Sequence, residues 1–276
     1  MTPDPFHGSR PMQESEASVT YQSYLQLDTL LSLQVPRSAG PEHDEMLFIV
    51  IHQVYELWFK EMLHEIEHVE ILFRSDKPHR AQHTLKRILT ILKVLVAQLD
   101  ILETMTPLEF LSFRARLEAA SGFQSNQFRQ IEFLLGAKTE SALARFPEGS
   151  PGRLALERRY RQPTVWDAFL HYLAREGYPV PDSHLTRDYS KPIEPTSEIQ
   201  QILLDVYRRD VKSAEICERL VDLDEGIAEW RYRHVRMVER TIGSKRGTGG
   251  SRGAAYLQST LGRNLFPDLW EIRSRL

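Results

Sequence analysis

The chain has very little cysteine and no long hydrophobic run, and each shortage excludes a class of protein. Cys217 is the single cysteine among 276 residues, which excludes an intramolecular disulfide and a cysteine-based zinc site. No apolar run approaches the ~20 residues that a membrane-spanning helix needs. Residues 1–18 are polar, contain prolines and lack the apolar core of a signal peptide. We therefore expect a soluble cytoplasmic protein with a disordered tail over residues 1–17.

An excess of charge of one sign is also missing. The chain has 35 lysines and arginines against 38 aspartates and glutamates, a balance that does not indicate a nucleic-acid surface. Alternation of apolar and polar residues with a period of two is almost absent, which argues against strands. Apolar residues recur instead every three or four positions. The pattern predicts an all-α fold, with one domain of long amphipathic helices over residues 18–276.

Caps and breakers set the bounds of the predicted helices. A short helix is expected at 20–34, set apart from the next one by a loop. Thr106 and Thr164 are N-cap residues, the first of them followed by proline, and Gly136 ends a helix that begins near residue 126. Long helices are expected at 44–73, 78–105 and 194–243, the last with a joint near Arg209.

One long apolar stripe leads to a histidine and then to a glycine-rich loop. His234 occupies the vacant place in a helical face that carries Leu220, Leu223, Ile227, Trp230 and Met237. A buried imidazole needs a partner for each ring nitrogen, or a metal. A core histidine bonded to another side chain is the simpler interpretation. The loop 247–250 favours a pocket instead, because glycines bring backbone N–H groups close to a ligand.

A second histidine, His52, lies on another stripe with Phe48, Tyr55 and Phe59. Alone it would be interpreted as a satisfied core histidine. Two such histidines on two long helices could also face each other across a flat cofactor such as haem.

Arg114 follows two aromatic residues on a further predicted helix, Phe110 and Phe113. Its guanidinium group either extends into solvent from the edge of the helix or binds a carboxylate through two parallel hydrogen bonds.

The segment His64–His68 matches H-E-x-x-H, a zinc-hydrolase pattern. Ile66 belongs to the buried stripe, so both histidines and Glu65 are expected on the solvated face, where a catalytic zinc has no cleft. A zinc hydrolase stays as one alternative, and a helical protein that only carries or senses haem on His234 is another. The residues alone indicate a helical protein that binds haem or a metal and an aromatic, carboxylate-bearing ligand, with its reaction open.

Five stretches, taken in order, resemble the tryptophan 2,3-dioxygenase family: 20–34, 48–61, 110–132, 165–181 and 230–257. The most specific are HQVYELWFK from His52 and RTIGSKRGTGGSRGAAYL from Arg240. The resemblance implies a haem enzyme of tryptophan catabolism. It would add both atoms of dioxygen across the indole C2–C3 bond of L-tryptophan, giving N-formylkynurenine as the first step of the kynurenine pathway.

The resemblance also implies which residues form the haem site. His234 would be the axial ligand of the iron of one haem b per subunit. Ser121 and Gly122 would lie at the haem edge. His52 would be the catalytic residue on the opposite side, near the indole N–H, and Phe48 would form part of the wall around the indole.

The same resemblance places the polar end of the substrate and a neighbouring subunit. Arg114 would pair with the carboxylate, and Thr248 would contact the carboxylate and the ammonium. Some family members have a tyrosine at the position of Phe110, whose hydroxyl also touches the carboxylate; that contact is absent here. Family members are homotetramers, and the first helix would contribute to the neighbouring active site through Tyr21, Tyr24 and Leu25.

Overall fold

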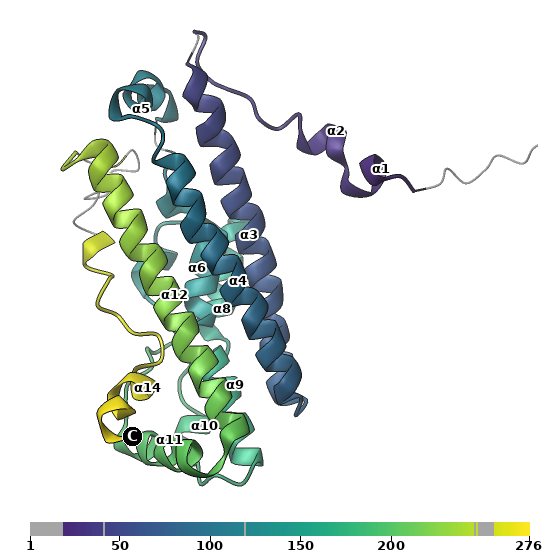
Figure 1. The fold of residues 1–276 in the computed structure, drawn as a ribbon, viewed down its shortest axis with the longest axis vertical. Helices are drawn as coiled ribbons and strands as arrows, with labels where there is room; N and C mark the ends of the chain where they lie inside the picture. Colours follow the sequence, from purple (N-terminus) through teal and green to yellow (C-terminus); the bar gives the residue numbers. More distant parts are fainter. Residues whose placement is uncertain (1–18, 41, 119, 246, 248–256) are drawn as a thin grey trace, which may run out of the picture.

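Three long helices form the frame of the protein: α3 (His43–Arg74), α4 (Pro78–Leu102) and α12 (Val211–Ile242) (Figure 1). The computed structural model describes residues 19–40, 42–118, 120–245, 247 and 257–276; the predicted tail at 1–17 lies outside them. Within these ranges the protein has helices and no strand. The predicted all-α fold is confirmed, and the bounds of the two longest predicted helices agree to within a few residues.

α4 packs against both of its long neighbours, and its buried face explains why. Leu85, Ile88, Leu92, Leu95 and Leu99 are all buried and recur at three- and four-residue steps. Gly226 of α12 lies against this face: a Cβ atom there would be 3.1 Å from Leu92 Cδ1. The small residue therefore permits the close crossing of α4 and α12 that brings the cavity-lining half of α12 into place.

Short helices close the frame at the end where α3 begins and α12 ends (Figure 1). α5 (Pro107–Arg114) starts after Thr106, the N-cap that the sequence predicts, and Glu109 completes a capping box with it. The 3-10 turns η1 (Ala115–Leu117) and η2 (Gly122–Gln124) then lead to α6 (Asn126–Leu134), which Ser125 caps. This connection passes over the end of the frame and so contributes residues to the cavity described below.

The remaining helices cover the other end and one side of the frame. They are α7 (Glu140–Leu143), α8 (Pro151–Arg161), α9 (Val165–Arg175), α10 (Asp182–Leu185), α11 (Ser197–Arg209), α14 (Pro267–Glu271) and η3 (Ile272–Arg275). The C-terminal segment returns to α12, where one carboxylate oxygen of Asp224 accepts the backbone N–H groups of Leu265 and Phe266 and the indole N–H of Trp270. This buried carboxylate fixes the end of the chain to the helix that carries His234.

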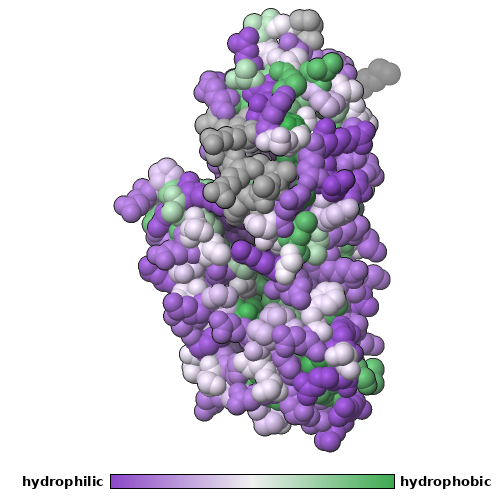
Figure 2. All heavy atoms as spheres, turned by 90° about the vertical axis from the view of Figure 1, so that its left-hand side faces the viewer, coloured by the Kyte–Doolittle hydropathy of each residue, from purple (hydrophilic) through white to green (hydrophobic). Residues whose placement is uncertain are grey.

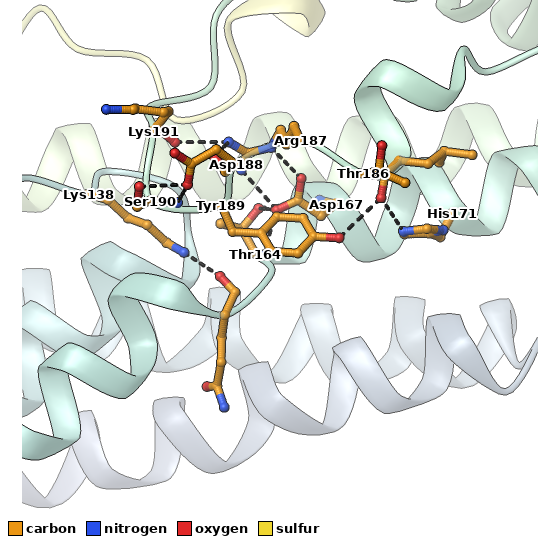
Figure 3. Close-up of polar contacts among 12 residues, drawn as sticks. Lys138, Thr164, Asp167, His171, Thr186, Arg187, Asp188, Tyr189, Ser190 and Lys191 are labelled. Atoms are coloured by element: carbon orange, nitrogen blue, oxygen red, sulfur yellow. Dashed lines mark hydrogen bonds and ion pairs between the residues drawn. The ribbon is translucent and has the colours of Figure 1, made fainter.

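A buried polar cluster joins α9 to two loops (Figure 3). Asp167 accepts two hydrogen bonds from the guanidinium of Arg187, at 2.6 and 2.9 Å, and also caps the start of its own helix at Thr164. Lys138 is buried nearby and donates to the main-chain carbonyl oxygens of Tyr160 and Gln162. These bonds satisfy charges that would otherwise be costly inside the protein.

The N-terminal residues leave the body of the molecule as an extended arm (Figure 1). The single helix predicted at 20–34 is wrong: the segment forms two short helices, α1 (Tyr21–Leu25) and α2 (Leu27–Leu30). Gln26 lies between them with φ +53°, a left-handed conformation that ends the first helix. Val19, Tyr21, Tyr24 and Leu31 of the arm are each more than two-thirds exposed.

The face shown in Figure 2 is mostly hydrophilic, with hydrophobic side chains in small groups. Among the described residues, no helix has both the length and the apolar character needed to span a bilayer.

Candidate active site

A cavity of about 240 Å³ lies where α3, α12 and the α5–α6 connection meet. It is much larger than the ~10–15 Å³ that one buried water needs. The cavity brings together seven of the residues predicted from the sequence, from α3, α5, the capped turn η2 and α12: Phe48, His52, Phe110, Arg114, Ser121, Gly122 and His234.

His52 projects from α3 into this cavity with a defined tautomer. Its Nδ1 atom lies 2.7 Å from the main-chain carbonyl oxygen of Phe48. Since a carbonyl oxygen only accepts, Nδ1 donates the hydrogen bond and Nε2 remains an acceptor. Burial lowers the pKa of His52, an effect that its bond to Phe48 and the charge of Glu56 oppose only in part. The imidazole is therefore neutral at pH 7.

His234 projects from α12 into the same cavity. Burial lowers its pKa to about 4, with smaller contributions from the charges of His52 and Arg129, so its imidazole is also neutral. Its ring lies nearly parallel to Trp230, with centroids 5.2 Å apart and planes at 20°. Neither ring nitrogen has a hydrogen bond to any residue within the described ranges, and a neutral imidazole with a free lone pair can bind a metal. Both histidines keep some accessible surface because they face the cavity, although protein surrounds them.

Three phenylalanines form an apolar wall beside His52. The ring centroids of Phe48 lie 5.8 Å from Phe110 and 5.6 Å from Phe113, and the last two rings meet edge to face at 5.5 Å. The Phe48 ring is also 4.0 Å from the imidazole of His52. Such packing holds flat surfaces in fixed positions, as required to orient an aromatic ligand.

Arg114 ends α5 directly beside this wall. The helix places Phe113 in the core, where it is fully buried, and turns the next side chain toward the cavity. A guanidinium at the edge of an aromatic wall can pair with a carboxylate in a fixed, two-pronged geometry. The side chain lines the cavity, which is the position that the carboxylate-binding interpretation of Arg114 requires.

A buried charge cluster on the cavity wall was not anticipated from the sequence. Glu132 of α6 bonds to Arg231 of α12 at 2.8 Å and to Arg129 of its own helix. Two guanidinium groups thus share one carboxylate, and Arg129 Nε is buried without a partner in the described part of the chain. The cluster leaves an excess positive charge beside His234. The only signal in the sequence was a charged residue, Arg231, next to Trp230 on a buried stripe.

α6 is fixed to α3 by a second contact on the same wall. The side-chain nitrogen of Gln127 donates to the main-chain carbonyl of Glu56 at 2.8 Å and to its carboxylate at 2.9 Å. Glu56 lies one helical turn after His52 and also lines the cavity. The contact sets the position of α6, and with it of Ser125 and Phe128 in the cavity wall, relative to His52.

Four of the predicted site residues are not among those in the cavity wall. Tyr21, Tyr24 and Leu25 lie in the arm, where both tyrosines are 76% exposed. Thr248 lies outside the described residues, although Gly247, just before it, does line the cavity.

The H-E-x-x-H segment takes part in the packing of α3 against α4. His64 is exposed, as expected, but the predicted exposure of Glu65 is wrong: it is buried and paired with Arg87 of α4 at 2.5 Å. The buried face of α3 is wider than its apolar stripe because α4 covers this side. Across the part of the chain that the structure describes, no group of three or more His, Cys, Asp or Glu residues could hold a metal.

Comparison with known proteins gives one consistent result. The sequence model of a family described as Tryptophan 2,3-dioxygenase matches residues 7–147 and 202–276. A tryptophan 2,3-dioxygenase from Herpetosiphon aurantiacus is 57% identical over 259 residues, covering 94% of this chain and 99% of the relative. Proteins of the same name from Anaeromyxobacter sp. and Myxococcus xanthus are 55% and 44% identical, over 94% and 93% of this chain and 97% and 89% of the relatives.

Proposed function

The chain belongs to the tryptophan 2,3-dioxygenase family and is an oxidoreductase, and from this premise we propose how its residues carry out the reaction. The proposed reaction adds both oxygen atoms of O2 to C2 and C3 of the indole of L-tryptophan, breaks the bond between them and gives N-formylkynurenine. The observation that supports it is that two neutral histidines and one arginine from three helices line a single cavity with an aromatic wall.

The residues present fit a haem. His234 offers a neutral imidazole with a free nitrogen, as an axial iron ligand requires. The cluster of Arg129, Glu132 and Arg231 has one positive charge in excess, and its buried Arg129 Nε has no partner among the residues that the structure describes. A haem carries two carboxylates, so it would supply the acceptor that this wall lacks. We therefore propose that His234 binds the iron of one haem b per subunit and that the arginines hold its carboxylates, with Ser121 and Gly122 at its edge.

The bound haem would supply the dioxygen chemistry, and the protein would supply position. His52 Nε2 is an acceptor facing the cavity, so it can receive the indole N–H of the substrate. Phe48 and Phe110 would contact the indole faces and edges. Arg114 would bind the substrate carboxylate, which fixes the indole at both ends and lowers the entropic cost of reaction.

The apolar wall serves a further purpose in this proposal. Leu99, Leu102, Met105 and Leu117 extend the apolar part of the cavity lining, where water finds few hydrogen-bond partners. A dry site strengthens the Arg114–carboxylate pair and protects a reactive intermediate from water. Phe110 has no hydroxyl, so Arg114 and the loop after Gly247 would hold the carboxylate. Thr248 of that loop is assigned here by the family resemblance alone.

The arm suggests that the active form is an assembly of copies of this chain. Tyr21, Tyr24 and Leu25 are exposed, and an apolar segment that leaves the body needs a surface to cover. We propose a homotetramer in which these residues enter the cavity of a neighbouring subunit and complete its substrate site.

One experiment tests the reaction and the cofactor together. The protein, reconstituted with haem if necessary, is reduced with dithionite without oxygen, and its visible spectrum is recorded with and without L-tryptophan before air is admitted. We expect a histidine-ligated ferrous spectrum that L-tryptophan perturbs, followed by N-formylkynurenine absorbance. Haem uptake without product would contradict the dioxygenase and support a haem carrier. Failure to bind haem, with zinc found by metal analysis, would instead support the hydrolase alternative.

A further inference from the structure

The base of the arm is held by two side chains of α3. We define the strap as residues 33–38, which join the arm (residues 19–32) to the body. Gln53 of α3 donates to the main-chain carbonyl of Leu33 at 3.0 Å and accepts a hydrogen bond from Gln34 at 2.5 Å. Glu45, two turns earlier on the same helix, holds the other end of the strap. The direction in which the arm leaves the subunit is therefore set by α3.

Glu45 makes the stronger of the two attachments. Its two carboxylate oxygens accept the backbone N–H groups of Arg37 at 2.7 Å and Ser38 at 3.0 Å. Hydrogen bonds from an amide to a carboxylate are about twice as strong as those between neutral groups. Glu45 as a whole is only 1% exposed, and the strap that donates to both carboxylate oxygens helps to shield them from water.

The charge state of Glu45 agrees with this geometry. Burial alone would raise the pKa of its carboxyl, but the bonds from Ser38 and Arg37 and the charge of Arg116 more than offset burial and lower it. Glu45 is therefore ionised at pH 7. Arg116 lies in η1, two residues after Arg114, so one carboxylate acts on both the strap and the turn that follows the arginine of the cavity.

An arm of this kind needs a fixed base. Its exposed apolar side chains lie between Val19 and Leu31, before the strap begins, and free rotation at the base would spread them over many directions. Ordering such a segment at the moment of association costs binding free energy, and a base that is already fixed removes part of that cost.

We propose that Glu45 is a positioning residue: by holding the strap on α3 it directs the arm of its own subunit toward the cavity of a second copy of this chain. The proposal rests on the arm exchange stated under Proposed function and adds the residue that makes it efficient. Glu45 lies seven residues before His52 on α3. The helix that presents His52 to one cavity thus also directs the arm that completes the neighbouring site.

The test compares three variants of the full chain loaded with haem. Glu45→Gln removes the charge that holds the strap. Gln53→Ala removes the second attachment, and because Gln53 is partly accessible, this variant keeps the test valid should Glu45→Gln fold poorly. Asp44→Asn is the matched control: Asp44 is also acidic and in the first turn of α3, so any loss of interaction with the helix dipole is shared. Circular dichroism checks that all three fold.

Three measurements follow: hydrogen exchange of the Arg37 and Ser38 amides, sedimentation over a range of protein concentrations, and KM and kcat for L-tryptophan. For Glu45→Gln we expect amide protection to fall and the concentration at which the assembly dissociates to rise, each about tenfold, with KM raised more than kcat is lowered. Gln53→Ala should change the same quantities in the same direction by less, and Asp44→Asn should resemble the parent.

Three outcomes would overturn the inference. Amide protection that survives in Glu45→Gln would show that the carboxylate does not hold the strap. Lost protection with unchanged association and unchanged KM would show that the strap does not direct the arm. A parent protein that is monomeric at every concentration would remove the arm exchange itself, while product formation in the same sample would still decide the dioxygenase proposal.

Discussion

The Nδ1 atom of His52 donates a hydrogen bond of 2.7 Å to the main-chain carbonyl oxygen of Phe48, which lies one turn earlier on α3. Helix geometry alone therefore fixes which imidazole nitrogen carries the proton. No other side chain needs to be placed for this purpose, and the acceptor nitrogen is available to a ligand in the cavity. An acceptor of this kind suits a residue that orients an N–H group.

The two cavity histidines should differ in what their loss does. We expect His52→Ala to lower kcat by about 10–100-fold, because an orienting contact is lost while the cofactor remains. His234→Ala should lose the histidine-ligated haem spectrum and all activity. Steady-state rates and visible spectra of both variants check this expectation. Complete loss of activity in both, with haem retained in His52→Ala, would show that His52 does more than orient.

Arg114 should act through the substrate carboxylate. We expect Arg114→Ala to raise KM for L-tryptophan by about 10–100-fold and Arg114→Lys to recover part of the loss, since an ammonium cannot reproduce the planar fork. Tryptamine, which lacks the carboxylate, provides the control: its weak binding should be the same in both variants and in the parent. A KM for tryptamine that rises with the substitution would point to a general disturbance of the cavity.

Glu70 of α3 should make stability depend on pH. Burial raises the pKa of its carboxyl to about 7, an effect that the charges of Arg74 and Lys138 reduce and that of Asp167 adds to. The folded protein therefore holds this proton more tightly than the unfolded chain, and the free energy of unfolding should fall as pH rises from about 4.5 to 7. We expect Glu70→Gln to be more stable than the parent by ~1–3 kcal/mol at pH 8 and similar to it at pH 4.

Denaturant unfolding at both pH values measures this difference, and the exposed Glu225→Gln on α12 is the control. Equal stability of Glu70→Gln and the parent at pH 8 would contradict the raised pKa. Lys138, in the cluster of Figure 3, is the neighbouring group to watch: burial lowers its pKa to about 8, so its own titration begins where that of Glu70 ends.

A side chain at Gly136, which follows α6, should destabilise the protein. Its φ is +100°, and a Cβ atom there would lie 2.4 Å from Ile193 Cδ1. Gly149 has φ +71° but open space around it, which separates backbone strain from the clash. We expect Gly149→Ala to cost ~1 kcal/mol of stability and Gly136→Ala ~2–4 kcal/mol. Thermal unfolding compares them, and equal losses would rule out the clash as a cause.

The sequence predicted those features that depend on local periodicity. The three- and four-residue steps on α3, α4 and α12 identified the buried faces, and with them the two histidines that point inward. Periodicity failed at Gln26, where one residue takes a left-handed conformation, and at Glu65, where α4 covers more of α3 than the apolar stripe indicates. Neither a backbone conformation nor the cover that a neighbouring helix provides is encoded in the spacing of apolar residues.

The charge cluster of the cavity was beyond sequence-based prediction for another reason. Glu132 and Arg231 are 99 residues apart, and their contact exists only because α6 and α12 meet at the cavity. Nothing local marks such a pair. The surface that receives Tyr21 and Tyr24 is likewise not defined by the order of residues in one chain, because in our proposal it belongs to another copy.

The triple acceptor at Asp224 has a consequence for biosynthesis. Its carboxylate oxygen binds donors from residues 265–270, which are synthesised after the whole of α12. Until then the Asp224 carboxylate of α12 lacks these three hydrogen-bond donors. A carboxylate without them is costly to bury in the core. The helix that carries His234 therefore reaches its final packing only after residue 270 has been synthesised, and a nascent chain that stalls before it would have an incompletely packed cavity wall.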